Sequence, residues 1–313
     1  MWAYITRKLL LLIPTAFVVL VILFLMLRVV PGDPAVAALG SEASEQAVQA
    51  LRAELGLDQP LYVQFIRYAG GVLQGDLGRS LVTRTPISKE IATALPYTMS
   101  YAVSSLVVAI VLGILFGVMT AVKRNTIIDY LGRIFSLAGL SFPEFYLGLL
   151  LMLLLAVHWD LLPAVGAGDF DNPKDLIRHL ILPSLTGGLI MTAYITRLTR
   201  SSMLDVIRED YIATARAKGL KESTVILRHA LKNALISIVT IVGMYFGLHF
   251  AGSIMVEIIF ARPGMGKLLL SAIKQNDYNV VQSVIFVYCL IIMVVNLVTD
   301  VIYGWIDPRI VYK

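Results

Sequence analysis

The apolar positions of this chain are gathered into long runs instead of the short periodic pattern of a soluble domain. Leu9–Leu27 is 19 residues without a charged side chain, and Leu95–Val122 is 28. A helix of roughly 20 apolar residues spans a bilayer core about 30 Å thick, so both runs can cross a membrane. The pattern predicts an all-α membrane protein with six transmembrane helices. The four other runs are Ile134–Val157, Leu180–Thr196, Ala234–Val256 and Val280–Val301.

The first apolar run has two readings, a cleaved signal peptide or a retained helix. Arg7 and Lys8 form a basic start, and Ala35-Val36-Ala37 resembles a cleavage site. However, the apolar region of a signal peptide is typically about 7–15 residues long, and this run has 19. Cleavage would also fall beyond Pro31-Gly32-Asp33-Pro34. We therefore interpret residues 1–30 as a short N-terminal segment and a retained transmembrane helix.

The orientation follows from the uneven distribution of Lys and Arg, which concentrate on the cytoplasmic side of membrane proteins. With the N-terminus inside, the inside segments hold 15 of the 26 Lys and Arg in 66 residues. The outside segments hold 10 in 107 residues. This asymmetry predicts that both termini are cytoplasmic. The inside segments are 1–8, 123–133, 197–233 and 304–313, and the outside segments are 31–95, 158–178 and 258–278.

Composition agrees with a membrane class. Hydrophobic residues make up 58% of the chain and charged residues 15%, whereas a soluble domain usually carries about 25% charged residues. The net charge of +5 is accounted for by the inside segments, so it gives no reason to expect nucleic acid as a partner. The single cysteine, Cys289, excludes an internal disulfide.

The outside segment 31–95 is far longer than an ordinary connection. It predicts a helix over Glu42–Leu55, with Ser41 as N-cap and Gly56 as a stop signal. A second stretch, Leu61–Leu73, has aromatic and polar residues at helical spacing and is expected at the membrane interface. The segment either packs over helix ends or forms a docking platform for an external partner, and its length favours docking. The predicted parts are 1–30, 31–95, and a core of five transmembrane helices over 96–313.

Small residues inside two of the apolar runs have the spacing of close helix packing. Gly113-x-x-x-Gly117 and Gly243-x-x-x-Gly247 both fit this motif. They indicate a tight helix bundle and do not indicate what the protein carries.

The inside segment 197–233 is long enough for two or three short helices. Tyr211–Gly219 predicts a compact helix that a glycine ends. Its apolar positions Ile212, Ala215 and Gly219 share one side, with Ala213 beside them. Because this side is small and flat, another protein could approach its backbone closely.

Charge along the same helix follows the helix dipole. The acids Glu209 and Asp210 stand at its start, and the bases Arg216 and Lys218 at its end. The residues alone leave two readings open, a docking helix for a partner protein or an ordinary basic cytoplasmic loop.

Short motifs are spread over nearly the whole chain. They are Asp210–Leu220 with Arg228–Ala234, Pro31–Pro34, Leu55–Leu61, Gly75–Ser80, Ser141–Pro143, Val256–Gly266 and Ile306–Pro308. Together these motifs resemble those of the permeases of binding-protein-dependent ABC importers, and more narrowly the branch that serves dipeptides, oligopeptides, glutathione and nickel. The wider superfamily begins its signature loop with Glu-Ala-Ala, where this chain has Ala213-Thr214-Ala215, and that difference is similar to the usual form of the peptide branch.

The resemblance implies a type I importer permease that forms half of a translocation pore for short peptides, or for nickel or another small solute. Its implied partners are a homologous second permease, two cytoplasmic ATPases, an external substrate-binding protein and membrane lipid. ATP and Mg would be bound by the ATPases, so this chain would carry no cofactor and no catalytic residue. The implied location is the cytoplasmic (inner) membrane of a bacterium or archaeon. The implied coupling helix, which would contact the ATPase, comprises Glu209, Asp210, Tyr211, Ala213, Thr214, Ala215, Arg216, Lys218 and Gly219.

Two other classes fit less well. A secondary transporter would need ionisable residues along several spans to couple an ion gradient, and only Glu144 lies in the middle of a predicted span. The interpretation as a membrane-embedded enzyme is not supported, because the four histidines are scattered over different segments and form no catalytic motif. Gly264-Met265-Gly266-Lys267 hints at a phosphate loop, but Leu268 replaces the required Ser or Thr. No metal site is predicted.

Glu144 is the most unusual position of the predicted spans. It lies 11 residues after Arg133, which places it roughly 16 Å into a core of about 30 Å. Pro143 cannot donate a backbone hydrogen bond, so the helix is expected to break or kink at the same depth. Either Glu144 is protonated or paired with a group of the partner permease, or it lines a translocation path together with Ser141 and Pro143.

The predicted orientation can be tested by labelling. A cysteine introduced at Ser44 should react with an impermeant thiol reagent outside intact cells or spheroplasts, because residue 44 lies in the outside segment. A cysteine introduced at Ser223 should react only after the membrane is broken. The reverse pattern of labelling would overturn the orientation.

Overall fold

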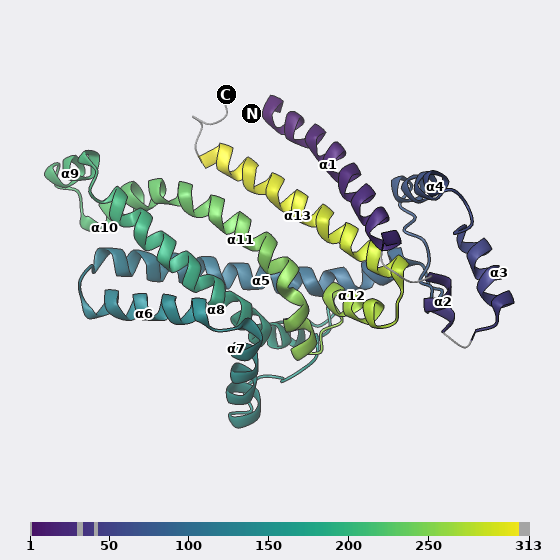
Figure 1. Ribbon diagram of the computed structural model, residues 1–313. Helices are drawn as coiled ribbons and strands as arrows, with labels where there is room; N and C mark the ends of the chain where they lie inside the picture. Colours follow the sequence, from purple (N-terminus) through teal and green to yellow (C-terminus); the bar gives the residue numbers. More distant parts are fainter. Residues whose placement is uncertain (1, 30–33, 41–42, 307–313) are drawn as a thin grey trace. The chain divides into compact units, whose positions relative to one another are not determined.

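The computed structural model describes residues 2–29, 34–40 and 43–306. Within them the chain is almost entirely helical, and its only β-type pairing is an isolated bridge between Arg79 and Pro86 (Figure 1). The helices are α1 (Trp2–Val29), α2 (Pro34–Leu39), α3 (Glu45–Leu55), α4 (Leu61–Leu73), α5 (Ile87–Val122), α6 (Ile127–Ser141), α7 (Glu144–Leu151), α8 (Pro173–Val206), α9 (Asp210–Ala217), α10 (Glu222–Thr224), α11 (Leu231–Ile259), α12 (Met265–Lys274) and α13 (Tyr278–Ile306). Two π-helical segments, Met152–His158 and Val225–Ala230, continue α7 and precede α11.

The chain groups into two compact units. One is built on Met99–Arg262 and includes α6 to α11, and the other is built on Ile5–Thr98 with Pro263–Val294. The predicted boundary at residue 96 falls next to the boundary of the units at Thr98. Pro263–Val294, however, was assigned to the core from sequence and groups with the external segment in the structure.

Several helices of the described residues can span a membrane. Four are long and apolar enough by themselves: Thr6–Met26 within α1, α5, α8, and Tyr278–Ile302 within α13. The bent pair of α6 with α7 adds a fifth if it counts as one span. α11 contains the predicted run Ala234–Val256 and continues for 29 residues, a length of about 44 Å at roughly 1.5 Å per residue. The all-α membrane class is confirmed, and the count of six spans with cytoplasmic termini stays a prediction.

The third predicted span is not one straight helix. The axes of α6 and of α7 with its π-helical extension are bent by 108°. The break falls at Phe142 and Pro143, which have extended backbone between the two helices. The expected break at Pro143 is therefore confirmed, and the predicted span Ile134–Val157 is divided between α6 and α7 with its π-helical extension.

α8 is also longer than its apolar run. Leu180–Thr196 predicted only its middle, because the helix begins at Pro173 and ends at Val206. Asn172 caps its start by accepting a hydrogen bond from the backbone of Asp175 (3.3 Å). The charged and polar residues on both sides of the apolar run are therefore also helical, and a hydropathy pattern alone does not predict them as helix.

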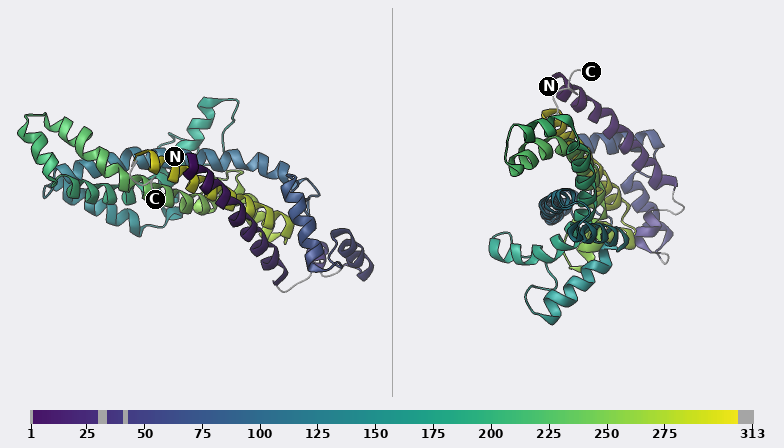
Figure 2. Two further views of the ribbon diagram at one scale, coloured as in Figure 1. Left: turned by 90° about the horizontal axis from the view of Figure 1, so that it is seen from above. Right: turned by 90° about the vertical axis from the view of Figure 1, so that its left-hand side faces the viewer.

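α8 is the central helix of the unit built on Met99–Arg262. It packs against α6, α7 and α11, and α9 lies at the far end of the hairpin that α8 and α11 form (Figures 1 and 2). The core here is made of small and medium side chains from α5, α8 and α11, including Ala109, Met191 and Ile238. Burial of this apolar cluster stabilises the hairpin.

Glycines permit the close approach of these helices. A Cβ atom at Gly113 would clash with Ile195, and one at Gly117 would clash with Thr199. A Cβ atom at Gly243 would clash with Thr299 of α13. The packing role predicted for Gly113, Gly117 and Gly243 is confirmed.

In the other unit, α3 and α4 follow the sequence prediction with one correction. α3 begins at Glu45, and its N-cap is Ser44, whose hydroxyl accepts from the backbone N–H of Ala47 (3.3 Å). The predicted cap Ser41 and the start at Glu42 lie outside the described residues. Gly56 ends α3 with φ 67°, as predicted. Ser41 and Ser44 are both suitable N-cap residues, so the sequence alone does not decide between them.

α4 has one packed side and one open side. Phe65 meets Phe17 and Phe24 of α1, with ring centroids 5.9 and 5.3 Å apart. Tyr62 and Ile66 are exposed on the other side. The helix predicted over Leu61–Leu73 is thus confirmed and packs on α1, and its location at the membrane interface stays a prediction.

The close approach at Gly113 predicts a simple stability test. Gly113→Ala should lower the stability of the purified protein by roughly 1–3 kcal/mol, because the added methyl group overpacks the contact with Ile195. Gly252→Ala is the matched control on α11, since no atom lies within 4 Å of its Cβ position. It should leave the stability unchanged or raise it by up to about 1 kcal/mol. Equal unfolding temperatures for the two variants would contradict the close approach.

Candidate functional site

The loop between α8 and α11 carries the predicted coupling helix. α9 spans Asp210–Ala217, with Glu209 at its N-cap position and Gly219 just beyond its end at φ 75°. The predicted helix and its glycine stop are confirmed. The two ends of the predicted inside segment 197–233 are helical, because α8 runs to Val206 and the π-helical segment before α11 begins at Val225.

One side of α9 faces its own chain. Ile212 is fully buried and Ala215 is 7% exposed. Both belong to a core cluster with Met203 of α8 and Val225 and Ile226 before α11. The expectation that the Ile212 and Ala215 side receives a partner is therefore corrected, because the apolar stripe of this helix is satisfied within the chain.

The opposite side of α9 is open. Ala213 and Thr214 are exposed there. Gly219 is also exposed, and a Cβ at this glycine would meet no atom within 4 Å. The small residues that a partner could approach are thus Ala213 and Gly219. Glu209, Tyr211, Arg216 and Lys218 are exposed around them.

Two polar contacts hold α9 to the following segment. Arg216 donates to Glu222 from Nε (3.1 Å) and Nη2 (2.8 Å). Asn233 Nδ2 donates to the Tyr211 hydroxyl (2.7 Å). The Arg216 guanidinium lowers the pKa of Glu222 below its usual value. The pair is therefore fully charged at neutral pH and is lost only as the pH falls through that lowered pKa.

A buried ion pair joins α6 to α8 close to the end of α8 that leads into this loop. Asp129 of α6 accepts from Arg200 of α8 at 2.6 and 2.9 Å, in the two-bond geometry that fixes orientation. The Asp129 side chain is fully buried and also accepts from the backbone N–H of Asn125 (3.0 Å). This pair joins α6 to α8 near the base of the α8–α11 hairpin. The sequence carried no signal for it, because 71 residues separate the partners.

Glu144 has partners that sequence reasoning missed. Its Oε1 accepts from the Tyr101 hydroxyl (2.7 Å), and His249 Nδ1 lies 3.7 Å from the same oxygen. Tyr101 is fully buried and His249 is 8% exposed, whereas the Glu144 side chain is 25% exposed. The acid at the break thus has polar neighbours from α5 and α11 of its own chain and keeps an open side.

The two other residues of the expected path lie at the break itself. Pro143 is the residue before α7, Glu144 is its first residue, and Ser141 is the last residue of α6. Ser141 and Pro143 are exposed, and the Ser141 hydroxyl donates to the carbonyl of Leu137 (3.0 Å). Ser141, Pro143 and Glu144 therefore lie side by side at the break. Of these three, Glu144 has a side-chain contact to another helix within the described residues.

A cavity of about 520 Å³ opens between α6, α8 and α11. Its polar lining includes Ser136, Thr196 and three arginines, Arg133, Arg197 and Arg200. Tyr194 and Tyr245 also line it, with ring centroids 4.4 Å apart. Tyr245 lies one helical turn before His249 on α11, so the cavity and the Glu144 cluster share a helix.

No group of three or more His, Cys, Asp or Glu side chains in residues 2–29, 34–40 and 43–306 could hold a metal ion. Two histidines of the described chain show different kinds of contact, His249 with Glu144 of another helix and His179 within its own helix. His179 contacts the backbone carbonyl of Asp175 through Nδ1 (2.9 Å).

The chain thus combines one broken span, a polar cavity between α6, α8 and α11, and a short helix on the hairpin of two long helices. Similarity to known proteins assigns this arrangement to a membrane transport subunit. Residues 109–312 match the family described as binding-protein-dependent transport system inner membrane component, and residues 1–102 match its N-terminal region. The chain belongs to this family. It is a multi-pass permease subunit of a binding-protein-dependent ABC importer in the cytoplasmic membrane.

Curated relatives match over the full length. The glutathione transport system permease protein GsiC of Salmonella paratyphi A is 45% identical over 310 residues, 99% of each chain. The protein of the same name from Escherichia coli K12 is 44% identical over the same share.

A solved structure shares the fold. A chain of the inward-facing MetNI methionine ABC transporter has a TM-score of 0.56 and 18% identity, over 69% of this chain and 96% of the other. The type I permease architecture expected from the sequence is confirmed by this likeness and by the family match.

Proposed function

We propose that this permease takes up glutathione or other short peptides, driven by ATP that partner subunits hydrolyse. The observation that supports the substrate class is the identity of 44–45% over 99% of the chain to glutathione permeases. A homologous second permease completes the pore, and an external binding protein delivers the solute. ATP and Mg are bound by two cytoplasmic ATPases, so this chain contributes pore and coupling surface and no catalytic residue.

α9 is the proposed contact to the ATPase. Its exposed small residues, Ala213 and Gly219, let the rim of a cleft approach the helix backbone. Its buried residues, Ile212 and Ala215, pack α9 onto the ends of α8 and α11. A force on α9 is therefore passed to two long helices as a rigid body, which is the element that a two-state switch needs.

Glu144 is the proposed polar contact on the translocation path. An acid within a span is tolerated where protein or a water-filled cavity surrounds it. The Tyr101 hydroxyl holds one carboxylate oxygen, while the partly exposed side of the group remains able to meet a peptide ammonium group. Ser141 and Pro143 line the same break.

The coupling role predicts opposite effects at neighbouring alanines. Ala213→Trp should abolish co-purification of the ATPase and uptake, with the unfolding temperature unchanged, because residue 213 is exposed. Ala215→Trp should instead destabilise the protein, since overpacking a core typically costs roughly 1–3 kcal/mol. Ser223→Trp is the control, a small exposed residue on α10 outside the proposed contact. Normal assembly and uptake by Ala213→Trp would rule out this side of α9 as the coupling surface.

The path role predicts a charge-dependent change at Glu144. Glu144→Gln should reduce uptake of peptides with a free amino terminus by roughly tenfold, the loss expected for one charge-assisted contact. N-acetylated peptides should be carried equally by the variant and the wild type, and ATPase assembly should be retained. Asp160→Asn, at an exposed position after the π-helical segment, is the control. Identical uptake of both peptide classes by Glu144→Gln and the wild type would contradict the contact.

A further inference from the structure

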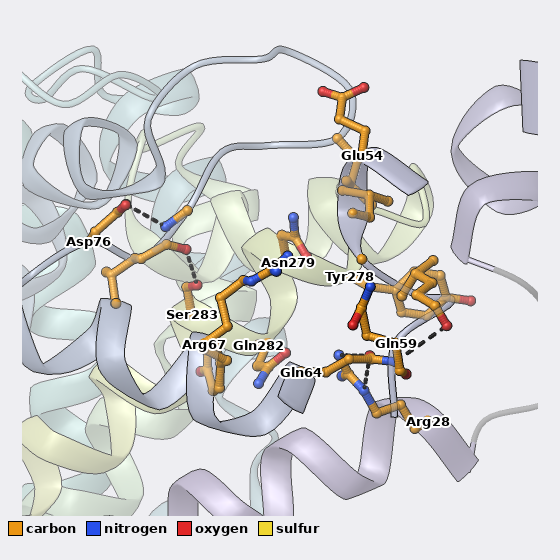
Figure 3. A pocket seen from close by; sticks show the side chains of 18 of the residues that line it. Arg28, Glu54, Gln59, Gln64, Arg67, Asp76, Tyr278, Asn279, Gln282 and Ser283 are labelled. Carbon is orange, nitrogen blue, oxygen red and sulfur yellow. Dashed lines mark hydrogen bonds between the residues drawn. The ribbon is translucent and has the colours of Figure 1, made fainter. Parts of the chain in front are cut away.

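A polar pocket of about 320 Å³ lies within the unit built on Ile5–Thr98 and Pro263–Val294 (Figure 3). The segment from α3 to α4 forms much of its wall, and the first turns of α13 complete it with Tyr278, Asn279, Gln282 and Ser283. Most of its lining belongs to the predicted outside segment 31–95. The motifs Leu55–Leu61 and Gly75–Ser80 both contribute to its wall, and the resemblance implies no role for either of them.

A buried amide and a buried phenol lie side by side in this pocket. Gln282 is 6% exposed, and its amide is placed to donate to the Tyr68 hydroxyl. In the described part of the chain, no other group comes within hydrogen-bond distance of Gln282 Nε2 or of the buried Tyr68 hydroxyl. Burial raises the pKa of Tyr68 to about 12, so the phenol keeps its proton at neutral pH. Buried donors normally have acceptors, so the phenol proton and the second amide N–H point to an acceptor ligand.

Two guanidinium groups add positive charge to the same pocket. Arg28 donates to Gln64 Oε1 from Nε (3.3 Å) and Nη2 (3.1 Å) and stacks over Phe24 at 3.7 Å. Arg67 lies against Gly56, where a Cβ would stand 2.7 Å from its Nη1. Gly56 thereby leaves room for this guanidinium, which gives the αL glycine a second role besides ending α3.

The acids of the lining are already engaged. Glu54 pairs with Arg84 (3.4 Å), and Asp76 accepts from the backbone N–H of Gly78 (2.9 Å). Arg67 and Gln282, both labelled in Figure 3, and the Tyr68 hydroxyl beside Gln282 are donors of this lining that a ligand could meet. A planar guanidinium with amide and phenol donors is the arrangement that recognises a carboxylate.

We propose that this pocket binds a carboxylate presented by the external binding protein, as an Asp or Glu side chain at its docking face. The proposal rests on the proposed function, which supplies that partner. A segment of this size on the outside is a surface for a protein, and a pocket within it suits one anchoring side chain. A free carboxylate of the transported peptide has the same chemistry, and the test separates the two sources.

The test uses the whole transporter, both permeases with their ATPases, in nanodiscs. The Kd of the labelled cognate binding protein is measured for wild type, Arg67→Gln and Gln282→Leu, with Arg52→Gln as the control on α3 outside the pocket. Loss of one charge-assisted contact should weaken docking about tenfold in the first two variants. The weakening should shrink as salt rises for Arg67→Gln, and the control should bind normally. ATPase co-assembly and the unfolding temperature report on folding.

A second arm measures the binding of free tripeptide and of its C-terminal amide to the same complexes. The proposal expects no dependence on Arg67 or Gln282 in this arm. Tripeptide binding that requires both residues and the free carboxylate would assign the pocket to the substrate and overturn docking. Unchanged Kd values in both arms would overturn the site, while failure of the wild type to assemble with an ATPase would instead refute the proposed function.

Discussion

The packing of α8 against α6, α7 and α11 is the interaction on which the rest of this permease unit depends. Glycines and small hydroxyl residues occupy the contact positions, where bulkier side chains would clash, so the helix backbones approach one another closely. In a bilayer, lipid tails are as apolar as leucine, and such close van der Waals contact replaces the hydrophobic effect as the source of helix association. The bidentate pair of Asp129 and Arg200 fixes the same helix near the end that leads to α9.

This packing explains how a surface helix can act on the membrane interior. α9 is only eight residues long, and a helix of that length is not stable alone in water. It is ordered because Ile212 and Ala215 are buried against the ends of α8 and α11. The α11 helix in turn carries His249, which lies beside Glu144. One rigid hairpin therefore connects the proposed ATPase contact to the polar cluster at the broken span.

The sequence predicted what local patterns determine and missed what long-range packing determines. The long helices, the α9 helix with its Gly219 stop and the break at Pro143 follow from hydropathy and from glycine and proline chemistry. The burial of Ala215 does not, because a small side chain on a short helix fits a partner protein or its own core equally well. The contact of Tyr101 with Glu144 and the contact of Tyr68 with Gln282 join residues far apart in the chain, and no local pattern predicts them.

The central claim is that α9 is held by its Ala215 side and meets the ATPase with its Ala213 side. Cysteine cross-linking in the assembled transporter, with Cys289 replaced by serine, tests it most directly. A cysteine at residue 213 should cross-link to an ATPase subunit through a short bifunctional reagent, and a cysteine at residue 215 should not. Cross-linking from residue 215 with none from residue 213 would contradict the account.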